Sequence, residues 1–197
     1  MNYANLRKID KLYFGYPDIG TVLGITPASA RVSANRYVRQ GYLVRVKRNL
    51  YVLRERWDRL SGKELFIIAN LIQVPSYVSL MTAMGYHDVT TQIQRDFIES
   101  IAIKRTKSVD VRGRAFTFSK IDSNLYFGFE RREGFFIATP EKAYLDALYL
   151  KSLNKYNFDM ASVDFGKLDI AKVRRMVKKF PMRTRKALER YGKFKKS

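Results

Sequence analysis

Residues 18–53 read DIGTVLGITPASARVSANRYVRQGYLVRVKRNLYVL, and this stretch decides the fold expected for the N-terminal part of the chain. A short apolar segment runs into a turn at Gly24. Thr26 then offers a side-chain oxygen as a helix cap, and Pro27 suits the first helical position, where no backbone donor is needed. Gly41 tolerates the positive φ that ends such a helix. The pattern predicts a helix-turn-helix.

A hairpin is expected directly after the second helix. Residues 42–46 and 50–53 are rich in β-branched and aromatic side chains, and Lys47, Arg48 and Asn49 separate them. A further helix is expected over residues 5–14, where apolar residues recur at helical spacing. Together these elements predict a winged helix-turn-helix domain over residues 1–56.

Helical spacing of about 100° per residue divides the second helix into two faces. The face expected to pack on the other helices holds Ala30, Ala34, Tyr37 and Val38. The opposite face suits a DNA groove, because Arg can pair with guanine, Asn with adenine, and Ala or Val can touch a thymine methyl. The recognition residues predicted on it are Ala28, Ser29, Arg31, Val32, Asn35, Arg36 and Arg39.

Ser29 lies near the helix start, so it is expected to contact a phosphate and set register rather than sequence preference. The wing residues Arg45, Lys47 and Arg48 suit the flanking minor groove or the DNA backbone. The alternative is an ordinary solvated helix and hairpin with charges facing water.

The charge of the chain is concentrated in two blocks. The formal net charge is +20 over 197 residues. Residues 26–56 contain eight basic residues and one acidic residue, and residues 171–197 contain twelve and one. Because phosphate contacts dominate nucleic-acid affinity, two such blocks indicate a polyanionic partner. For the second block, a solubilising or membrane-surface role remains the alternative.

The second block is expected to form two basic amphipathic helices. Val173, Met176, Val177 and Phe180 repeat at helical spacing, and a second helix follows the break at Pro181. The narrow apolar stripe favours docking on its own domain over a membrane. The additional basic surface is predicted at Lys172, Arg174, Arg175, Lys178, Lys179, Arg183, Arg185 and Lys186.

A second domain is expected over residues 63–197, giving an α+β chain. Helices are expected at residues 64–72 and 76–86, and Thr139, Pro140 and Glu141 mark the start of another that runs to about Leu153. Short alternating runs predict helices packed on a mostly antiparallel sheet. The expected strands are residues 97–103, 115–118, 125–129 and 134–138.

Catalytic motifs are sparse. The chain has one histidine, His87, and no cysteine, so a histidine–cysteine metal site or a serine–histidine triad would rest on one imidazole. Glu141 and Asp146 point about 140° apart on one helix, too divergent for a carboxylate pair, and Asp164-Phe165-Gly166 stands without a phosphate loop. Acids in the middle of the chain look like members of surface ion pairs. We expect no enzyme, no cofactor and no metal site.

Targeting segments are also missing from the sequence. No apolar run approaches the roughly 20 residues of a membrane span, and the first residues lack the apolar core of a signal peptide. A cytoplasmic protein without a membrane partner is expected.

Three stretches carry a resemblance to a known family. They are residues 25–53, residues 66–107 and residues 125–150, and together they cover about half the chain. The chain resembles the AbiEi-type antitoxins of bacterial abortive-infection toxin–antitoxin systems. The block TPEKAYLDALYL at residues 139–150 is the most family-specific part.

The resemblance implies a winged-helix domain that binds inverted repeats in its own promoter and represses the operon. It also implies a C-terminal domain that neutralises a nucleotidyltransferase toxin, either by direct binding or indirectly. Two alternatives stay open at this point. One is a stand-alone transcriptional regulator with a ligand-sensing C-terminal domain, and the other is an RNA-binding protein that shields the toxin's target.

Overall fold

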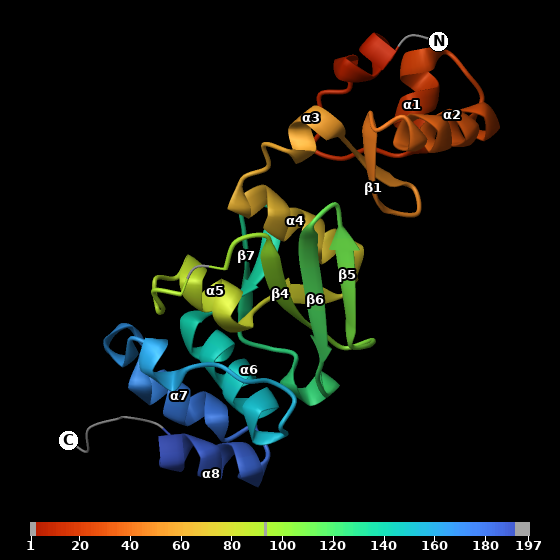
Figure 1. Cartoon of the computed structure of the whole chain (residues 1–197). Coiled ribbons are helices and arrows are strands. Elements are labelled where there is room, and N and C mark those ends of the chain that lie inside the picture. Colours follow the sequence, from red (N-terminus) through yellow and green to blue (C-terminus); the bar gives the residue numbers. More distant parts are fainter. Residues whose placement is uncertain (1–2, 93, 192–197) are drawn as a thin grey trace. The chain divides into compact units, whose positions relative to one another are not determined.

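The chain folds into two compact α+β units. The structure is a computed structural model that describes residues 3–92 and 94–191 (Figure 1). The N-terminal unit comprises Met1–Ile68 and the C-terminal unit Ala69–Ser197, so the division falls inside helix α4 (Gly62–Ile72). Residues 192–197 of the second basic block lie outside the described residues.

The N-terminal unit consists of short helices and one β-hairpin. Its elements are η1 (Tyr3–Lys8), α1 (Tyr16–Leu23), α2 (Pro27–Arg39), β1 (Leu43–Lys47), β2 (Leu50–Leu53) and α3 (Arg54–Trp57). The helix signals of the sequence are confirmed. The Thr26 hydroxyl accepts a hydrogen bond from the Ser29 N–H at 3.3 Å, and Gly24 and Gly41 have φ angles of 62° and 79°.

The helix expected over residues 5–14 was wrong. A 3₁₀ helix ends at Lys8, and Phe14 is extended, exchanging two backbone hydrogen bonds with Tyr51 of β2 at 2.9 and 3.0 Å. The apolar spacing of this segment instead reflects separate core contacts. Leu6, Ile9 and Phe14 are buried in one cluster with α1, α2 and the hairpin.

The C-terminal unit is built on a six-stranded sheet with the order β5-β6-β4-β3-β8-β7. The strands are β3 (Ser76–Val78), β4 (Phe97–Ala102), β5 (Lys107–Val111), β6 (Arg114–Lys120), β7 (Phe129–Arg132) and β8 (Phe135–Ala138). The sheet is mixed rather than mostly antiparallel, because β4 runs parallel to β6 and β3 parallel to β8. The other neighbours in the order are antiparallel.

Two of these strands escaped the sequence analysis. Residues 76–78 were expected to be helical, but they form β3, and the helix begins only after Ser79. All three residues of β3 are buried, so no alternation identifies the strand. β5 lies at the edge of the sheet and is too polar to stand out. The segment expected as a strand at 125–129 contains the end of η2 (Ser123–Leu125) and only the first residue of β7.

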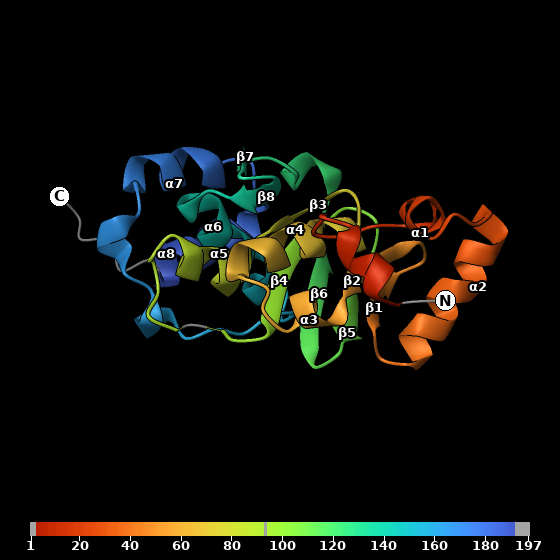
Figure 2. The ribbon, with the colours of Figure 1, turned by 90° about the horizontal axis from the view of Figure 1, so that it is seen from above.

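Helices cover the C-terminal unit. They are α5 (Leu80–Tyr86), α6 (Pro140–Ser152), α7 (Ile170–Val177) and α8 (Met182–Tyr191), with the 3₁₀ turns η3 (Met160–Ser162) and η4 (Phe165–Lys167). α6 packs against α5, α7 and α8 (Figure 2). The predicted start of α6 is confirmed, because Thr139 caps the helix at the Lys142 N–H. No helix among the described residues is long and apolar enough to span a membrane.

Candidate nucleic-acid interface

Helix α2 has one buried face and one exposed face, as its sequence predicts. Ala30 and Ala34 are fully buried and Tyr37 is 2% exposed. On the opposite side Val32 is 70% exposed, a large fraction for an aliphatic residue. Of the predicted recognition residues, Asn35 is half-buried, while Ala28, Ser29, Arg31, Val32, Arg36 and Arg39 are exposed. The structure therefore places these seven residues along one helix surface.

The hairpin is tied to the start of α1 by side chains that the sequence analysis did not assign. The Asn49 Oδ1 atom accepts a hydrogen bond from the Tyr16 N–H at 2.7 Å, and the hydroxyls of Tyr16 and Tyr51 lie 3.1 Å apart. A Cβ atom at Gly15 would lie 2.8 Å from Asn49 Oδ1, so a larger residue there would displace the Asn49 side chain. Asn49 has a φ of 57°, a conformation that Asn adopts more readily than most residues. An Asn in the turn of the expected hairpin was the signal in the sequence for this position.

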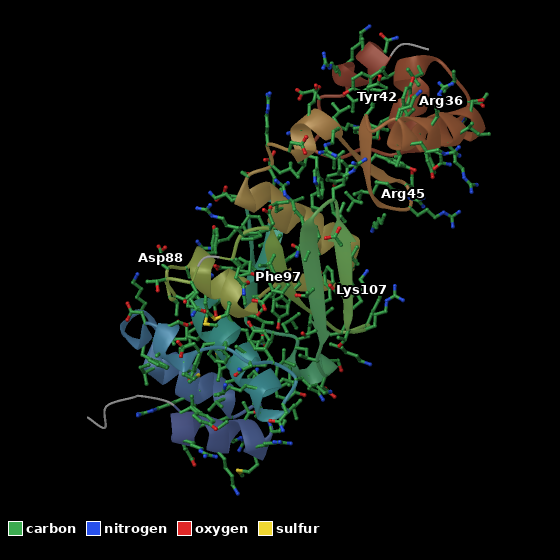
Figure 3. All side chains as sticks on the ribbon, in the orientation of Figure 1. Arg36, Tyr42, Arg45, Asp88, Phe97 and Lys107 are labelled. Carbon is green, nitrogen blue, oxygen red and sulfur yellow. The ribbon has the colours of Figure 1, made fainter. Side chains whose placement is uncertain are left out.

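Aromatic rings hold the C-terminal end of α2. The rings of Tyr3 and Tyr42 stack with centroids 4.3 Å apart, and both contact Tyr37. The Arg36 guanidinium carbon lies 5.4 Å from the centre of the Tyr37 ring. Arg36 on α2 and Arg45 on the hairpin are labelled in Figure 3. The packing fixes the backbone that carries Arg36.

The exposed face of α2 and the hairpin is free of acidic residues. Residues 27–53 contain no Asp or Glu. Carboxylates lie beside basic residues outside this stretch, since Arg7 binds Glu55 at 2.6 Å and Arg54 binds Asp58 at 2.8 Å. The three wing residues Arg45, Lys47 and Arg48 are exposed. Cationic side chains without acidic neighbours in sequence give this surface a positive potential.

Most residues of the predicted additional basic surface are exposed. Arg174, Arg175, Lys178, Lys179, Arg183 and Lys186 are exposed. Lys172 instead forms an ion pair with Glu141 at 2.7 Å. Arg185 donates to the backbone oxygens of Phe180 and Lys178, which fixes the turn between α7 and α8. Lys172 and Arg185 therefore have structural contacts as well as a place on this surface.

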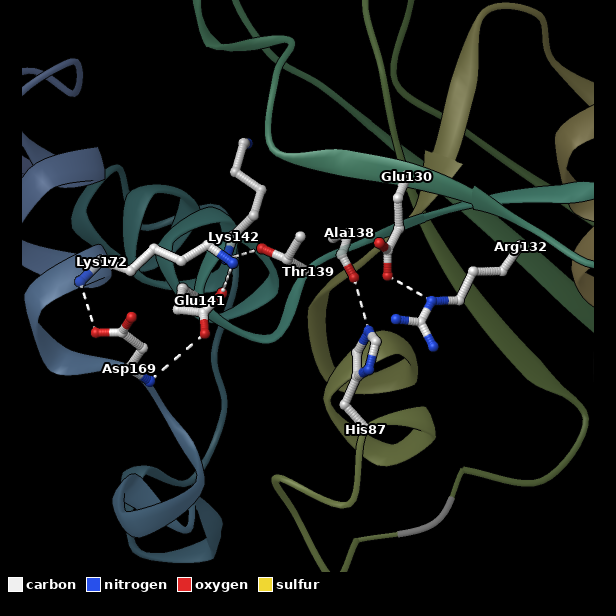
Figure 4. A network of polar contacts seen from close by, with 9 residues as sticks. All are labelled: His87, Glu130, Arg132, Ala138, Thr139, Glu141, Lys142, Asp169 and Lys172. Atoms are coloured by element: carbon white, nitrogen blue, oxygen red, sulfur yellow. Dashed lines mark hydrogen bonds and ion pairs between the residues drawn. The ribbon is translucent and has the colours of Figure 1, made fainter.

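Glu141 links α6 to the start of α7 (Figure 4). Its Oε1 atom accepts from the Asp169 N–H at 3.4 Å, while its Oε2 atom binds Lys172. Burial opposes ionisation of the Glu141 carboxyl, but the Lys172 ammonium outweighs it and lowers the pKa. Glu141 is therefore more than a first-turn acid, and it joins two helices.

A fully buried ion pair lies inside α6, where surface pairs were expected. Lys142 and Asp146 are each 0% exposed and bind each other one turn apart. Asp146 also accepts from the hydroxyls of Ser79 at 2.8 Å and Tyr77 at 3.0 Å. Lys142 donates to the Tyr77 hydroxyl at 2.8 Å and lies among aromatic rings, including that of Phe127. The i,i+4 spacing of the two charges between apolar residues was the signal for this pair.

Burial shifts the pKa of both members away from the charged form. It lowers the pKa of the Lys142 ammonium and raises the pKa of the Asp146 carboxyl, while each charge partly offsets the shift of the other. Neither side chain reaches the surface. The pair therefore serves to join α6 to β3.

The remaining candidate residues have structural roles. The His87 Nε2 atom lies 2.8 Å from the Ala138 carbonyl oxygen (Figure 4), and burial lowers the pKa of the imidazole. Asp164 caps η4 by accepting from the Gly166 N–H at 3.0 Å. Within residues 3–92 and 94–191, no group of three His, Asp or Glu side chains could hold a metal ion.

No protein-family model matches the chain, and no curated protein matches it.

Proposed function

We propose that the N-terminal unit binds duplex DNA in a sequence-specific manner as a winged helix-turn-helix, with α2 in the major groove. The observation that carries the proposal is the exposed, acid-free face of α2 beside a hairpin tied to α1. A helix of this kind fits the major groove, and its cations neutralise phosphates.

The residues of this face and of the hairpin have different roles in the proposal. Arg36 and Asn35 pair with base edges, and Val32 touches a thymine methyl. The Ser29 hydroxyl accepts from Thr26 at 3.1 Å, which leaves its own proton for a phosphate oxygen. The wing cations contact the backbone or the flanking minor groove.

The cellular role that we propose follows from the resemblance of residues 25–53, 66–107 and 125–150 to AbiEi-type antitoxins. The protein represses its own operon by binding promoter inverted repeats, and it neutralises a nucleotidyltransferase toxin encoded beside it. It acts by binding rather than by catalysis.

Fluorescence anisotropy with two labelled duplexes tests the DNA-binding half. One duplex carries the sequence upstream of the gene, and the other carries the same bases shuffled. At physiological salt we expect the upstream duplex to bind on the order of a thousandfold more tightly. Equal affinity for both would refute a repressor.

Co-expression tests the antitoxin half. The full chain and the neighbouring gene are placed under separate promoters, and growth is recorded with and without each. Rescue by the full chain from a promoter that it cannot repress supports neutralisation. If the upstream duplex is bound but growth is not rescued, the protein is a stand-alone regulator.

A further inference from the structure

A basic groove lies in the C-terminal unit, and none of its lining residues belongs to α2 or the hairpin. Its volume is about 800 Å³, within the range of small-ligand sites. Five of the side chains that line it are cationic, and none of its described lining residues is acidic. The cations are Lys151, Lys155, Arg183, Lys186 and Arg190.

The fold of α8 explains one wall of the groove. Thr184 and Leu188 are buried one turn apart, and the Thr184 hydroxyl lies 3.3 Å from that of Ser152 on α6. This seating turns another side of α8 toward the groove. Arg183, Lys186, Ala187 and Arg190 follow one another at helical spacing along that side.

The opposite wall comes from the end of α6 and the turn after it. Lys151 donates to Asn157 Oδ1 at 2.7 Å, which holds its ammonium group at the groove. Lys155 is exposed. Cations thus stand on both walls, and an anion between the walls would be attracted to both.

Aromatic rings complete the site. Tyr156 lines the groove. Its hydroxyl donates a hydrogen bond to the buried carboxylate of Glu99, which restrains the ring. Tyr191 lies at the end of α8 with 37% of its surface exposed. A cationic track with aromatic rings is the combination that holds phosphates and stacks bases of single strands.

We propose that this groove binds a single strand of nucleic acid, with its phosphates between the two cationic walls and a base against Tyr191. The site goes beyond the proposed operator binding and does not depend on it. A double helix is broader than its major groove, which alone is about 12 Å wide, whereas a recess of about 800 Å³ has room for part of a single strand.

Fluorescence anisotropy of the full chain tests the groove. The probes are labelled oligo-uridine and oligo-thymidine of about 12 nucleotides, a length in the range that single-stranded binding domains cover. The groove variant is Arg183→Ala with Lys186→Ala. The matched control is Arg174→Ala with Arg175→Ala, which removes the same charge from exposed positions of α7 outside the groove.

We expect the groove variant to bind the single strands about tenfold or more weakly than the control variant. Its plot of log affinity against log salt should flatten by about 1.4, or 0.7 for each lost phosphate contact. Tyr191→Leu should also weaken binding about tenfold, while Tyr191→Phe should not, because stacking needs only the ring. The affinity of either variant for a shuffled duplex should stay within about twofold of that of its control.

The two probes separate the sources of the strand. Tighter binding of oligo-uridine assigns the groove to RNA, tighter binding of oligo-thymidine assigns it to single-stranded DNA, and both results support the site. Equal losses in the groove and control variants would show that only diffuse charge acts. That result would overturn the proposal. So would a groove variant that loses more affinity for the duplex than for either single strand.

Discussion

Helices α2 and α6 begin alike and serve opposite purposes. Each has 13 residues, a Thr cap and a Pro at its first position. In α2 four residues are buried, and the remaining surface carries arginines toward solvent. In α6 nine residues are buried, including a lysine and an aspartate. A capping signal sets where a helix begins, and the residues after it decide whether its charges face solvent or the protein's own core.

The first prediction removes the buried charge compensation of α6. Asp146→Asn leaves the Lys142 ammonium buried without a carboxylate, so we expect a loss of about 3–5 kcal/mol in the free energy of unfolding. Urea denaturation followed by circular dichroism measures it. The double variant Lys142→Met with Asp146→Asn should be more stable than the single variant, since no unpaired charge remains. A smaller loss in the single variant than in the double would contradict a buried charged pair.

The second prediction extends the contrast to another buried charge of the C-terminal unit. Burial raises the pKa of Glu99 from 4.5 to about 7, although its carboxylate accepts from the Met81 N–H at 3.1 Å. The unfolded chain therefore loses this proton first as pH rises, and the contribution of Glu99 to stability falls between about pH 4.5 and pH 7.

Glu99→Gln removes this dependence. The free energy of unfolding of the variant minus that of the unmodified protein should rise by roughly 3 kcal/mol from pH 4 to pH 8. This follows from about 1.4 kcal/mol per unit of pKa shift. Urea denaturation of both proteins across this range gives the difference, in which the titration of other groups cancels. A constant difference would mean that Glu99 ionises as easily in the folded state as in the unfolded one.

The third prediction concerns the exposed side of the comparison. Arg36→Ala and Asn35→Ala should each weaken binding to the upstream duplex by about 1–3 kcal/mol, because each removes a proposed base contact. The free energy of unfolding should change by no more than about 1 kcal/mol in either variant, because Arg36 is exposed and Asn35 only half-buried. A large loss of unfolding free energy with unchanged preference for the upstream duplex would contradict the role proposed for α2.

The fourth prediction tests the feature that the two helices share. Thr26→Ala and Thr139→Ala each remove a hydroxyl that accepts from the third helical N–H, at 3.3 and 3.4 Å respectively. We expect each to cost about 0.5–2 kcal/mol in unfolding free energy, with the larger loss at the half-buried Thr139. Thr→Ser at the same positions keeps the acceptor and serves as the control. If Thr→Ala left the unfolding free energy unchanged at either site, packing alone would set the start of that helix.

Local signals in the sequence predicted local structure well. The caps at Thr26 and Thr139, the turn at Gly24 and the hairpin depend on neighbouring residues, and the structure confirms them. Contacts between distant segments were not predictable in this way. β3 lies between β4 and β8 in the sheet. Asn49 accepts a hydrogen bond from Tyr16 of α1, which is 33 residues away in sequence. The surface of α2 could be predicted because one helical period defines it, whereas the groove beside α8 needs α6 in place.

Lys142 also offers a chemical probe of opening in the C-terminal unit. Its amine is 0% exposed, so a reagent that acylates lysines can reach it only when this unit opens. In the regime where reclosing outpaces acylation, the labelling rate of this one amine, read by peptide mass, measures the free energy of that opening without any denaturant. Acylation of Lys142 therefore reports how often the interior around α6 becomes accessible to solvent.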